Sequence, residues 1–242
     1  MQITILGDGP LGRAVADAAR EHGNDVLVLG RPLSGQHDRS LLVASDVVVE
    51  ASRPEAVATN VAAALDAACR RVVIATTAWT VDRDLVEGLL VGHGAAAVAA
   101  SNFSIGVALF GRLVDRAVEL FGHIEGFDPY LVEWHRRAKR DRPSGTARDL
   151  TARIVAGHPA LATSDDLEVV AIRAGSSPGM HLVGFDAPGE TLELRLTARD
   201  RSAFAAGILA AADWLVRDDR PAGLHPFDPI VDALLTGGAV AA

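Results

Sequence analysis

Sulfur is nearly absent from this chain of 242 residues, in which Cys69 is the only cysteine. One cysteine excludes a disulfide within the chain, and a lone thiol is typical of proteins kept in a reducing compartment. We therefore expect a cytoplasmic protein. Cys69 lies in an alanine-rich segment without a neighbouring base, so we interpret it as a small buried residue rather than a nucleophile.

Long apolar runs are also missing. The stretch 89–100 is apolar but is interrupted by Gly92, His93 and Gly94, and no run reaches the roughly 18 residues that span a membrane. The opening residues Gln2–Leu6 have the composition of a strand and lack the basic segment of a signal peptide. We expect neither a membrane segment nor a secretory signal.

Basic residues are outnumbered, because 23 Lys and Arg stand against 31 Asp and Glu and give a net charge of -8. An acidic chain repels a phosphate backbone, which argues against nucleic acid as a partner. Cationic side chains nevertheless cluster in residues 135–142, namely Arg136, Arg137, Lys139, Arg140 and Arg142. This local positive charge predicts a small anionic ligand.

Apolar material is sufficient for a core, since 49% of the residues are hydrophobic. Residues 1–100 alternate between short apolar runs and helical patterns. The expected strands are Gln2–Leu6, Asp25–Leu29, Asp46–Glu50, Arg71–Ala75 and Ala96–Ala100, and the expected helices are Leu11–Glu21, Pro54–Ala68 and Asp82–Val91. This alternation predicts right-handed crossovers and a parallel sheet of the Rossmann type.

The pattern changes after residue 126. The expected strands there are Phe127–His135, Leu167–Arg173, His181–Asp186 and Thr191–Ala198, and the expected helices are Ser144–Ala156, Ser202–Val216 and Asp228–Leu235. Leucines alternate with polar residues in Thr191–Ala198, which is typical of an open-faced antiparallel sheet. The fold class is therefore α/β, with an N-terminal Rossmann-type sheet and a second α+β domain of mostly antiparallel sheet.

A glycine-rich turn follows the first strand. Gly7, Gly9 and Gly12 form a G-x-G-x-x-G pattern, with Pro10 and Leu11 opening the helix. Such glycines permit a tight turn, close approach of a pyrophosphate and close packing of helix on strand, and the helix N-terminus attracts phosphate. Because strand and helix flank the pattern, we favour a dinucleotide site over a turn that merely needs glycine.

The end of the second strand lacks the acid that binds the ribose of NADH in many such folds. Gly30 and Arg31 occupy that place. The missing carboxylate and the guanidinium of Arg31 favour NADPH over NADH as cofactor. The alternative is that Arg31 is a solvated loop residue.

A second motif spans residues 133–147 and passes from a strand end through the basic loop into a helix start. Ser144 is suited to cap that helix, and Gly145 and Thr146 offer backbone N–H groups to an anion. His135 and Lys139 are candidate proton donors, and Lys139 is the only lysine in the chain. The alternative is a solvated basic loop before a capped helix.

This segment resembles the dihydrodipicolinate reductase family, whose motif is approximately E-x-H-H-x-x-K-x-D-x-P-S-G-T-A. The matching residues are Glu133, His135, Lys139, Asp141, Pro143, Ser144, Gly145, Thr146 and Ala147. Residues 101–107 resemble the family's N-F-S-x-G-V segment. Arg173, Gly175, Gly179 and His181 resemble its R-x-G…G-x-H stretch, and residues 198–205 resemble its A-x-x-R-x-x-F-A stretch. The resemblance covers nearly the whole chain.

The resemblance implies a two-domain reductase that uses NAD(P)H on a cyclic imine dicarboxylate, with hydride added at ring carbon C4 and a proton at the neighbouring carbon. We assign 1–106 plus 203–242 to the dinucleotide and 107–202 to substrate binding and oligomerisation, as a tetramer. His135 would be the acid/base residue and Lys139 its partner. The substrate contacts would be Arg136, Ser144, Gly145 and Thr146, and the nicotinamide side would be lined by Ala75, Thr76, Thr77, Ala100, Ser101, Asn102 and Phe103.

Departures from the family pattern leave the substrate open. Arg136 replaces a second histidine, Ala75 and Ala78 replace glycines, and Leu196 stands where the family usually has a histidine. Three hypotheses follow: the lysine-pathway reductase itself, a paralogue acting on another cyclic imine or small acid, and a non-catalytic NAD(P)-binding regulator. The remaining histidines have no partners at metal-ligand spacing along the chain, so we predict no metal.

Overall fold

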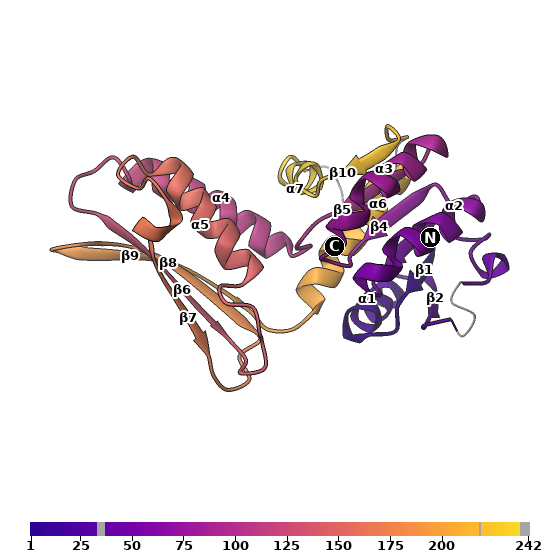
Figure 1. Ribbon diagram of the computed structural model, residues 1–242, viewed down its shortest axis with the longest axis horizontal. Coiled ribbons are helices and arrows are strands. Elements are labelled where there is room, and N and C mark those ends of the chain that lie inside the picture. Colours follow the sequence, from indigo (N-terminus) through magenta and orange to yellow (C-terminus); the bar gives the residue numbers. More distant parts are fainter. Residues whose placement is uncertain (33–36, 218, 238–242) are drawn as a thin grey trace. The chain divides into compact units, whose positions relative to one another are not determined.

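The computed structural model describes residues 1–32, 37–217 and 219–237 (Figure 1). The chain divides into two compact units: unit 1 comprises Met1–Ile105 and Arg201–Ala242, and unit 2 comprises Gly106–Asp200. Within the segment 203–242 that we assigned to the dinucleotide domain, residue 218 and residues 238–242 lie outside the described residues.

Unit 1 is built on a six-stranded sheet with the order β10-β5-β4-β3-β1-β2, and its neighbouring strands all run parallel. The strands are β1 (Gln2–Leu6), β2 (Asp25–Leu29), β3 (Val47–Glu50), β4 (Arg71–Ile74), β5 (Ala96–Ala99) and β10 (Gly223–His225). The apolar strands predicted in residues 1–100 are confirmed. β10 is not predicted, because three residues are too few to show a period.

The helices of unit 1 pack in pairs, α1 with α6 and α2 with α3. They are α1 (Pro10–Glu21), α2 (Val57–Asp66), α3 (Arg83–Gly92), α6 (Ser202–Arg217) and α7 (Asp228–Leu235), with 3-10 turns at Arg39–Leu41, Pro54–Ala56 and Thr80–Asp82. The chain moves from β1 to β2 in one direction and from β3 to β5 in the other. Right-handed crossovers therefore place α1 and the pair α2 and α3 on opposite faces.

The glycine turn between β1 and α1 depends on close backbone contacts. A Cβ atom on Gly7, which has a φ of 125°, would lie 2.3 Å from the carbonyl oxygen of Ala51, and one on Gly12 would lie 1.9 Å from the carbonyl oxygen of Gly7. A Cβ on Gly9, the N-cap of α1, would meet no described atom within 4 Å. Gly7 and Gly12 thus bring the turn together, and Gly9 leaves the space above it open.

Unit 2 is a four-stranded sheet with the order β7-β6-β8-β9. Its elements are α4 (Ile105–Phe121), which begins one residue before the unit, β6 (Asp128–His135), α5 (Gly145–Gly157), a 3-10 turn at Ser164–Asp166, β7 (Glu168–Arg173), β8 (Gly179–Ala187) and β9 (Glu190–Ala198). β6, β8 and β9 pair antiparallel, but β7 pairs parallel to β6. Helix α5 connects β6 to β7, and such a crossover returns the chain in the same direction.

One face of this sheet packs against α4 and α5 to form a core that includes Phe110, Leu131, Leu150 and Phe185. The sequence pattern does not predict α4, because Gly106 and Gly111 lower the intrinsic helix propensity of this segment. Packing of α4 on the sheet outweighs that cost. The opposite face carries exposed apolar side chains, described below. No helix among the described residues combines the length and the apolarity that crossing a lipid bilayer requires.

We predict that Gly12→Ala destabilises the protein by about 3 kcal/mol or more, because the added methyl group would collide with the backbone of Gly7. Gly9→Ala is the matched control and costs at most about 1 kcal/mol, since its methyl group meets open space and only helix capping weakens. Urea denaturation followed by circular dichroism measures both. Equal losses from the two variants would contradict this description of the turn.

Candidate active site

The glycine turn of unit 1 borders a cavity of about 380 Å³. Gly7, Gly9 and Arg31 line it together with Asp8 and Arg53. Pro10, Leu11 and Gly12 form the first turn of α1, as expected for a helix whose N-terminus faces phosphate. The open space above Gly9 and the helix N-terminus fit the pyrophosphate of a dinucleotide, so these residues are suited to hold one.

A second cavity of unit 1, of about 210 Å³, lies at the ends of β4 and β5. Its lining includes four of the residues expected beside a nicotinamide: Thr76, Thr77, Ala100 and Ser101. Ala75 is buried at the end of β4. Asn102 and Phe103 have contacts within the fold, because Asn102 Oδ1 accepts a hydrogen bond from the backbone N–H of Ser104 and the Phe103 ring packs edge-on against Phe227.

In unit 2, the buried face of β6 changes from apolar to polar toward its end. Leu131, Glu133 and His135 alternate along this face, and all three are buried. The strand register places His181 of β8 directly opposite Glu133 and Arg173 of β7 directly opposite His135. Three strands therefore contribute to one polar cluster at the edge of the core.

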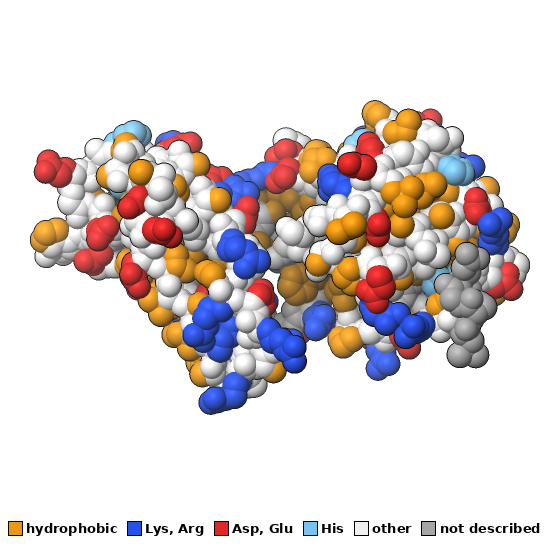
Figure 2. All heavy atoms as spheres, in the orientation of Figure 1, with side chains coloured by type: hydrophobic (Ala, Val, Ile, Leu, Met, Phe, Trp, Pro, Cys, Tyr) orange, Lys and Arg blue, Asp and Glu red, His pale blue; other side chains and the backbone are white. Residues whose placement is uncertain are grey.

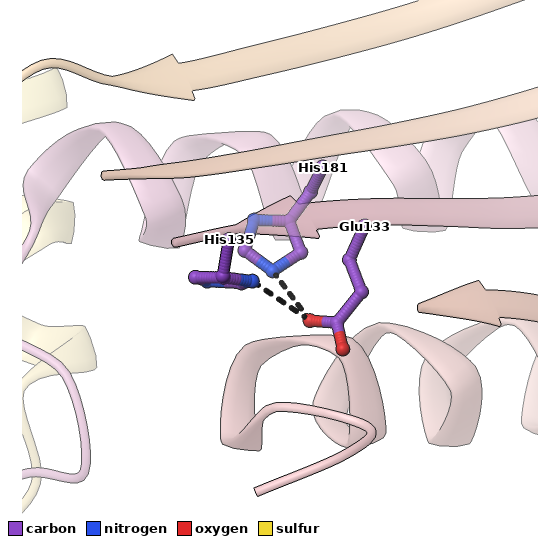
Figure 3. A group of neighbouring side chains, drawn as sticks. All are labelled: Glu133, His135 and His181. Carbon is purple, nitrogen blue, oxygen red and sulfur yellow. Dashed lines mark ion pairs between the residues drawn. The ribbon is translucent and has the colours of Figure 1, made fainter. Parts of the chain in front are cut away.

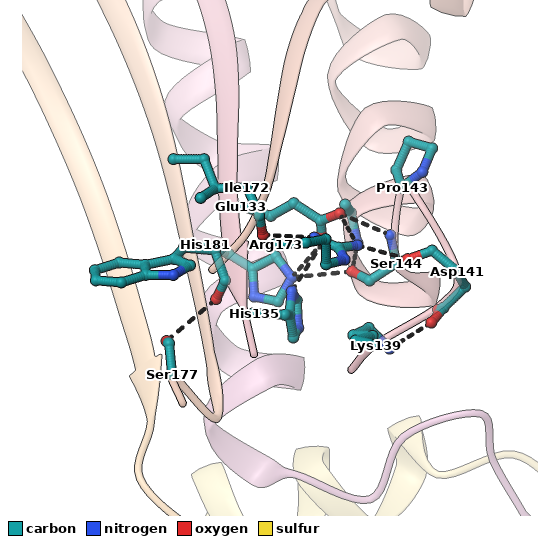
Figure 4. A network of polar contacts seen from close by, with 12 residues as sticks. Glu133, His135, Lys139, Asp141, Pro143, Ser144, Ile172, Arg173, Ser177 and His181 are labelled. Atoms are coloured by element: carbon teal, nitrogen blue, oxygen red, sulfur yellow. Dashed lines mark hydrogen bonds and ion pairs between the residues drawn. The ribbon is translucent and has the colours of Figure 1, made fainter. Parts of the chain in front are cut away.

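The Glu133 carboxylate lies at the centre of this cluster and has no solvent-exposed surface. Its Oε1 accepts hydrogen bonds from the backbone N–H of Ser144 (3.0 Å) and from Nη2 of Arg173 (2.7 Å), as Figure 4 shows. Its Oε2 lies 3.3 Å from Nδ1 of His135 and 3.6 Å from Nε2 of His181 (Figure 3). The carboxylate thus contacts β7, β8 and the start of α5.

Charge on the cluster follows from these contacts. Burial raises the pKa of Glu133, but hydrogen bonds from Ser144 and Arg173 outweigh it and hold that pKa below its ordinary value. Burial lowers the pKa of His135, with Glu133 opposing the shift and Lys139 and Arg173 adding to it. Burial, followed by the nearby His135, lowers the pKa of His181 to about 4. At neutral pH the cluster therefore holds a carboxylate and a neutral His181.

The start of α5 is attached to the same cluster. Ser144 caps the helix, because its Oγ accepts a hydrogen bond from the Ala147 N–H at 3.1 Å, and the same Oγ lies 3.2 Å from Nε2 of His181. Gly145 is exposed and Thr146 is half-buried at the first turn. The predicted anion-binding residues Ser144, Gly145 and Thr146 therefore follow one another at the start of α5, where Ser144 contacts the His181 imidazole.

The basic loop provides the remaining predicted residues. Nζ of Lys139 forms an ion pair with Asp141 Oδ1 at 2.9 Å, and Arg136 is exposed. Burial raises the pKa of Asp141, but its hydrogen bond from Lys139 outweighs burial, so the pKa lies below its ordinary value. Figure 2 shows Lys and Arg side chains, in blue, gathered along the lower edge of unit 2 in that view.

The cluster also has the composition of a metal-binding set. One ligand atom each from Glu133, His135 and His181 lie within 4.8 Å of one another, a grouping that spacing along the sequence does not reveal. However, the Arg173 guanidinium already pairs with the Glu133 carboxylate at 2.7 Å. The guanidinium therefore already balances the carboxylate charge at Oε1, which lowers the need for a metal ion beside Oε2 and the two imidazoles.

Glu133, Arg173 and His181 received no functional role from the sequence, although each belongs to a stretch that resembles the family. An acid and a histidine two residues apart on a strand share a face, which is a usable signal for Glu133. Arg173 and His181 become neighbours of these residues only through strand register. Leu196, the departure noted above, lies directly opposite His181 on β9.

The glycine turn at the parallel sheet of unit 1 and the buried acid–imidazole cluster beside a helix N-terminus of unit 2 are features that a dinucleotide-dependent oxidoreductase needs. A family model described as dihydrodipicolinate reductase, C-terminus, matches residues 106–228. The chain belongs to the dihydrodipicolinate reductase family, and the predicted family, α/β fold class and oxidoreductase activity with NAD(P)H are confirmed.

Individual relatives match most of the chain in sequence or in fold. The chain is 33% identical over 241 residues to a 4-hydroxy-tetrahydrodipicolinate reductase of Exiguobacterium sp., covering 93% of both chains. It is 34% identical over 210 residues to the enzyme of that name from Sulfurimonas denitrificans, covering 80% of this chain and 79% of the relative. The dipicolinate-bound dihydrodipicolinate reductase from Paenisporosarcina sp. TG-14 shares the fold, with a TM-score of 0.74 at 20% identity over 93% of this chain and 97% of that one.

Proposed function

We propose that the protein is a 4-hydroxy-tetrahydrodipicolinate reductase, which reduces a cyclic imine dicarboxylate with NAD(P)H. The observation that carries this proposal is the Glu133 carboxylate, which accepts the Ser144 N–H at the capped start of α5 and lies 3.3 Å from Nδ1 of the buried His135. Helix N-termini attract carboxylates, and a neighbouring imidazole is suited to exchange protons with a bound ring. When bound, the nicotinamide supplies the hydride.

Different residues of unit 2 bind the substrate carboxylates and donate the proton. Ser144, Gly145 and Thr146 present the first turn of α5 to one carboxylate, and Arg136 is available as a cation for the diacid. His135 donates the proton to the ring carbon next to the reduced one, and Lys139 assists it. Burial lowers the pKa of His135 in the free protein. A dianionic substrate would raise that pKa again and so protonate the residue when the substrate is present.

The paralogue remains the second candidate because of Leu196. This side chain packs against the core directly opposite His181, so β9 offers the site an apolar group where the family usually has an imidazole. An apolar wall favours a substrate with fewer polar substituents than the lysine-pathway intermediate. Turnover of other cyclic imines, without turnover of the lysine-pathway substrate, would select this candidate.

We predict that the purified protein oxidises NADPH when freshly prepared dihydrodipicolinate precursor is added, and that His135→Gln and Lys139→Ala each lower kcat by about 100-fold or more. Loss of the nicotinamide absorbance measures the reaction. Arg116→Ala, which removes an exposed surface ion pair in the same unit, is the control and should keep full activity. Cofactor binding without turnover by the wild-type protein would instead indicate the regulator.

The preference for NADPH rests on the cavity beside the glycine turn. Arg31 and Arg53 both line it, and the end of β2 offers no carboxylate of its own. Burial lowers the pKa of His37, another lining residue, so this side chain is a neutral group at pH 7. Two guanidinium groups suit a 2′-phosphate, whereas Asp8, whose carboxylate lies next to Gly30, would suit a ribose hydroxyl.

Arg31→Ala should therefore weaken NADPH binding roughly tenfold and leave NADH binding nearly unchanged, because only NADPH carries the phosphate. Fluorescence titration of the reduced cofactors measures both dissociation constants. Equal effects on the two cofactors would reject the preference. A larger loss of NADH binding from Asp8→Asn than from Arg31→Ala would show that the ribose hydroxyl is recognised instead.

Oligomerisation is proposed through the outer face of the unit 2 sheet, as the family resemblance implies. Trp134, Val170 and Ile172 are exposed there by 38%, 43% and 39%, and Trp134 is directly opposite Ile172 in the register. Adjacent exposed apolar side chains on one sheet face are typical of an interface. We also place the enzyme in the cytoplasm, on the evidence of its single cysteine.

Ile172→Glu should reduce the mass of the assembly in light scattering, because it buries a charge in the proposed interface. Leu113→Glu introduces the same charge at an exposed position of α4, away from the sheet face, and serves as the control. A wild-type protein that is monomeric at micromolar concentration would exclude the assembly.

A further inference from the structure

We propose that Glu133 is a positioning residue that holds a proton on Nδ1 of His135 and fixes this imidazole relative to the start of α5. The inference rests on the proposed function only for the role of His135 in turnover. The arrangement itself is visible in Figure 4, where the carboxylate lies between the imidazoles and the helix start.

The two oxygens of Glu133 have different surroundings. Oε1 accepts hydrogen bonds from the Ser144 N–H and from Arg173, whose Nη2 also donates to the Asp141 carbonyl oxygen at 2.6 Å. Oε2 is buried and has no hydrogen-bond partner among the described residues. A buried carboxylate oxygen without a donor is costly, so Oε2 demands a donor from the groups that face it.

His135 offers that donor. Its Nδ1 is likewise buried without a hydrogen-bond partner among the described residues, and it lies 3.3 Å from Oε2. A carboxylate accepts but cannot donate, so the pair is favourable only with a proton on Nδ1. This proton leaves Nε2 as the nitrogen that gains and loses the catalytic proton, as in other carboxylate–histidine pairs.

Neighbouring groups support this orientation. A Cβ on Gly179 would lie 3.1 Å from Nε2 of His135, so the glycine keeps that side of the ring uncrowded. His181 is the other imidazole near Oε2, at 3.6 Å, but its Nε2 also lies within 3.2 Å of Ser144 Oγ. Since its pKa of about 4 keeps it neutral, His181 does not compete with His135 for the carboxylate as a cation.

One carboxylate therefore controls two parts of the site. It accepts the N–H of the residue that caps α5, and it faces the ring that donates the proton. The charged groups that act on His135 are Glu133, Lys139, Arg173 and Asp141, and Glu133 is the largest influence that stabilises the imidazolium. Removing its charge would lower the pKa of His135 further.

Glu133→Gln is the direct test, because glutamine keeps one oxygen for Ser144 and Arg173 but can present an amide N–H₂ to the imidazole. A donor facing Nδ1 shifts the neutral ring to the form with its proton on Nε2. Nitrogen-15 NMR of the ring, in the full-length protein without substrate at pH 8, reports this directly. The His135→Gln spectrum, in which its signals vanish, assigns the resonances.

The wild-type spectrum should show the Nδ1–H form of His135, and the Glu133→Gln spectrum the Nε2–H form. An Nε2–H form in the wild-type protein overturns the proposal, even if the variant does not fold. The same form in both proteins also overturns it. Since no substrate is present, this result stands apart from the proposed reaction: a wild-type enzyme that fails to turn over would refute the function and leave the tautomer measurement intact.

Kinetics provide the second readout. Glu133→Gln should lower kcat about 100-fold with less than about a threefold change in KM, by analogy with the loss of tautomer control in other carboxylate–histidine pairs. The alkaline limb of the pH–rate profile should move to lower pH, because the imidazolium loses its carboxylate. Glu119→Gln, an isosteric change at an exposed ion pair of α4, should leave both unchanged. A rise in KM alone would show that Glu133 only shapes the substrate-binding first turn of α5.

Discussion

Burial of the Glu133 carboxylate is the constraint on which the architecture of unit 2 depends. An ionised carboxyl group without solvent exposure is tolerated only where hydrogen bonds and an opposite charge replace water. Arg173 provides the charge from β7, and the backbone of Ser144 provides a hydrogen bond from the start of α5. Satisfying one side chain thus aligns the end of β6, the end of β7 and the helix N-terminus that we assign to the substrate.

The two units achieve precision by different physical means. In unit 1, backbone contacts fix the conformation of the glycine turn, because Gly7 and Gly12 occupy places where any Cβ would collide with a carbonyl oxygen. In unit 2, electrostatics fix the geometry of the polar cluster, since this cluster is held by a carboxylate, a guanidinium and two imidazoles of lowered pKa. A nucleotide site defined by backbone sterics and a proton-transfer site defined by charge would suit the reductase that we propose.

The sequence predicts much of the fold, because apolar strands that alternate with helices leave a strong local pattern in residues 1–100. It does not predict α4, whose glycines weaken the helical signal, or the parallel pairing of β7 with β6, which depends on how α5 crosses the sheet. The same limit applies to the site. His135, Lys139 and Ser144 are visible in one short motif, whereas Arg173 and His181 join it through strand register.

The most direct test of the central claim is a crystal structure of the protein with NADPH and pyridine-2,6-dicarboxylate. We predict that one carboxylate of the diacid accepts hydrogen bonds from the backbone N–H groups of Gly145 and Thr146. Nε2 of His135 should face the ring of the diacid, while Nδ1 of His135 still faces Oε2 of Glu133. A diacid bound away from the start of α5, or a His135 ring turned from Glu133 in the complex, would contradict the account.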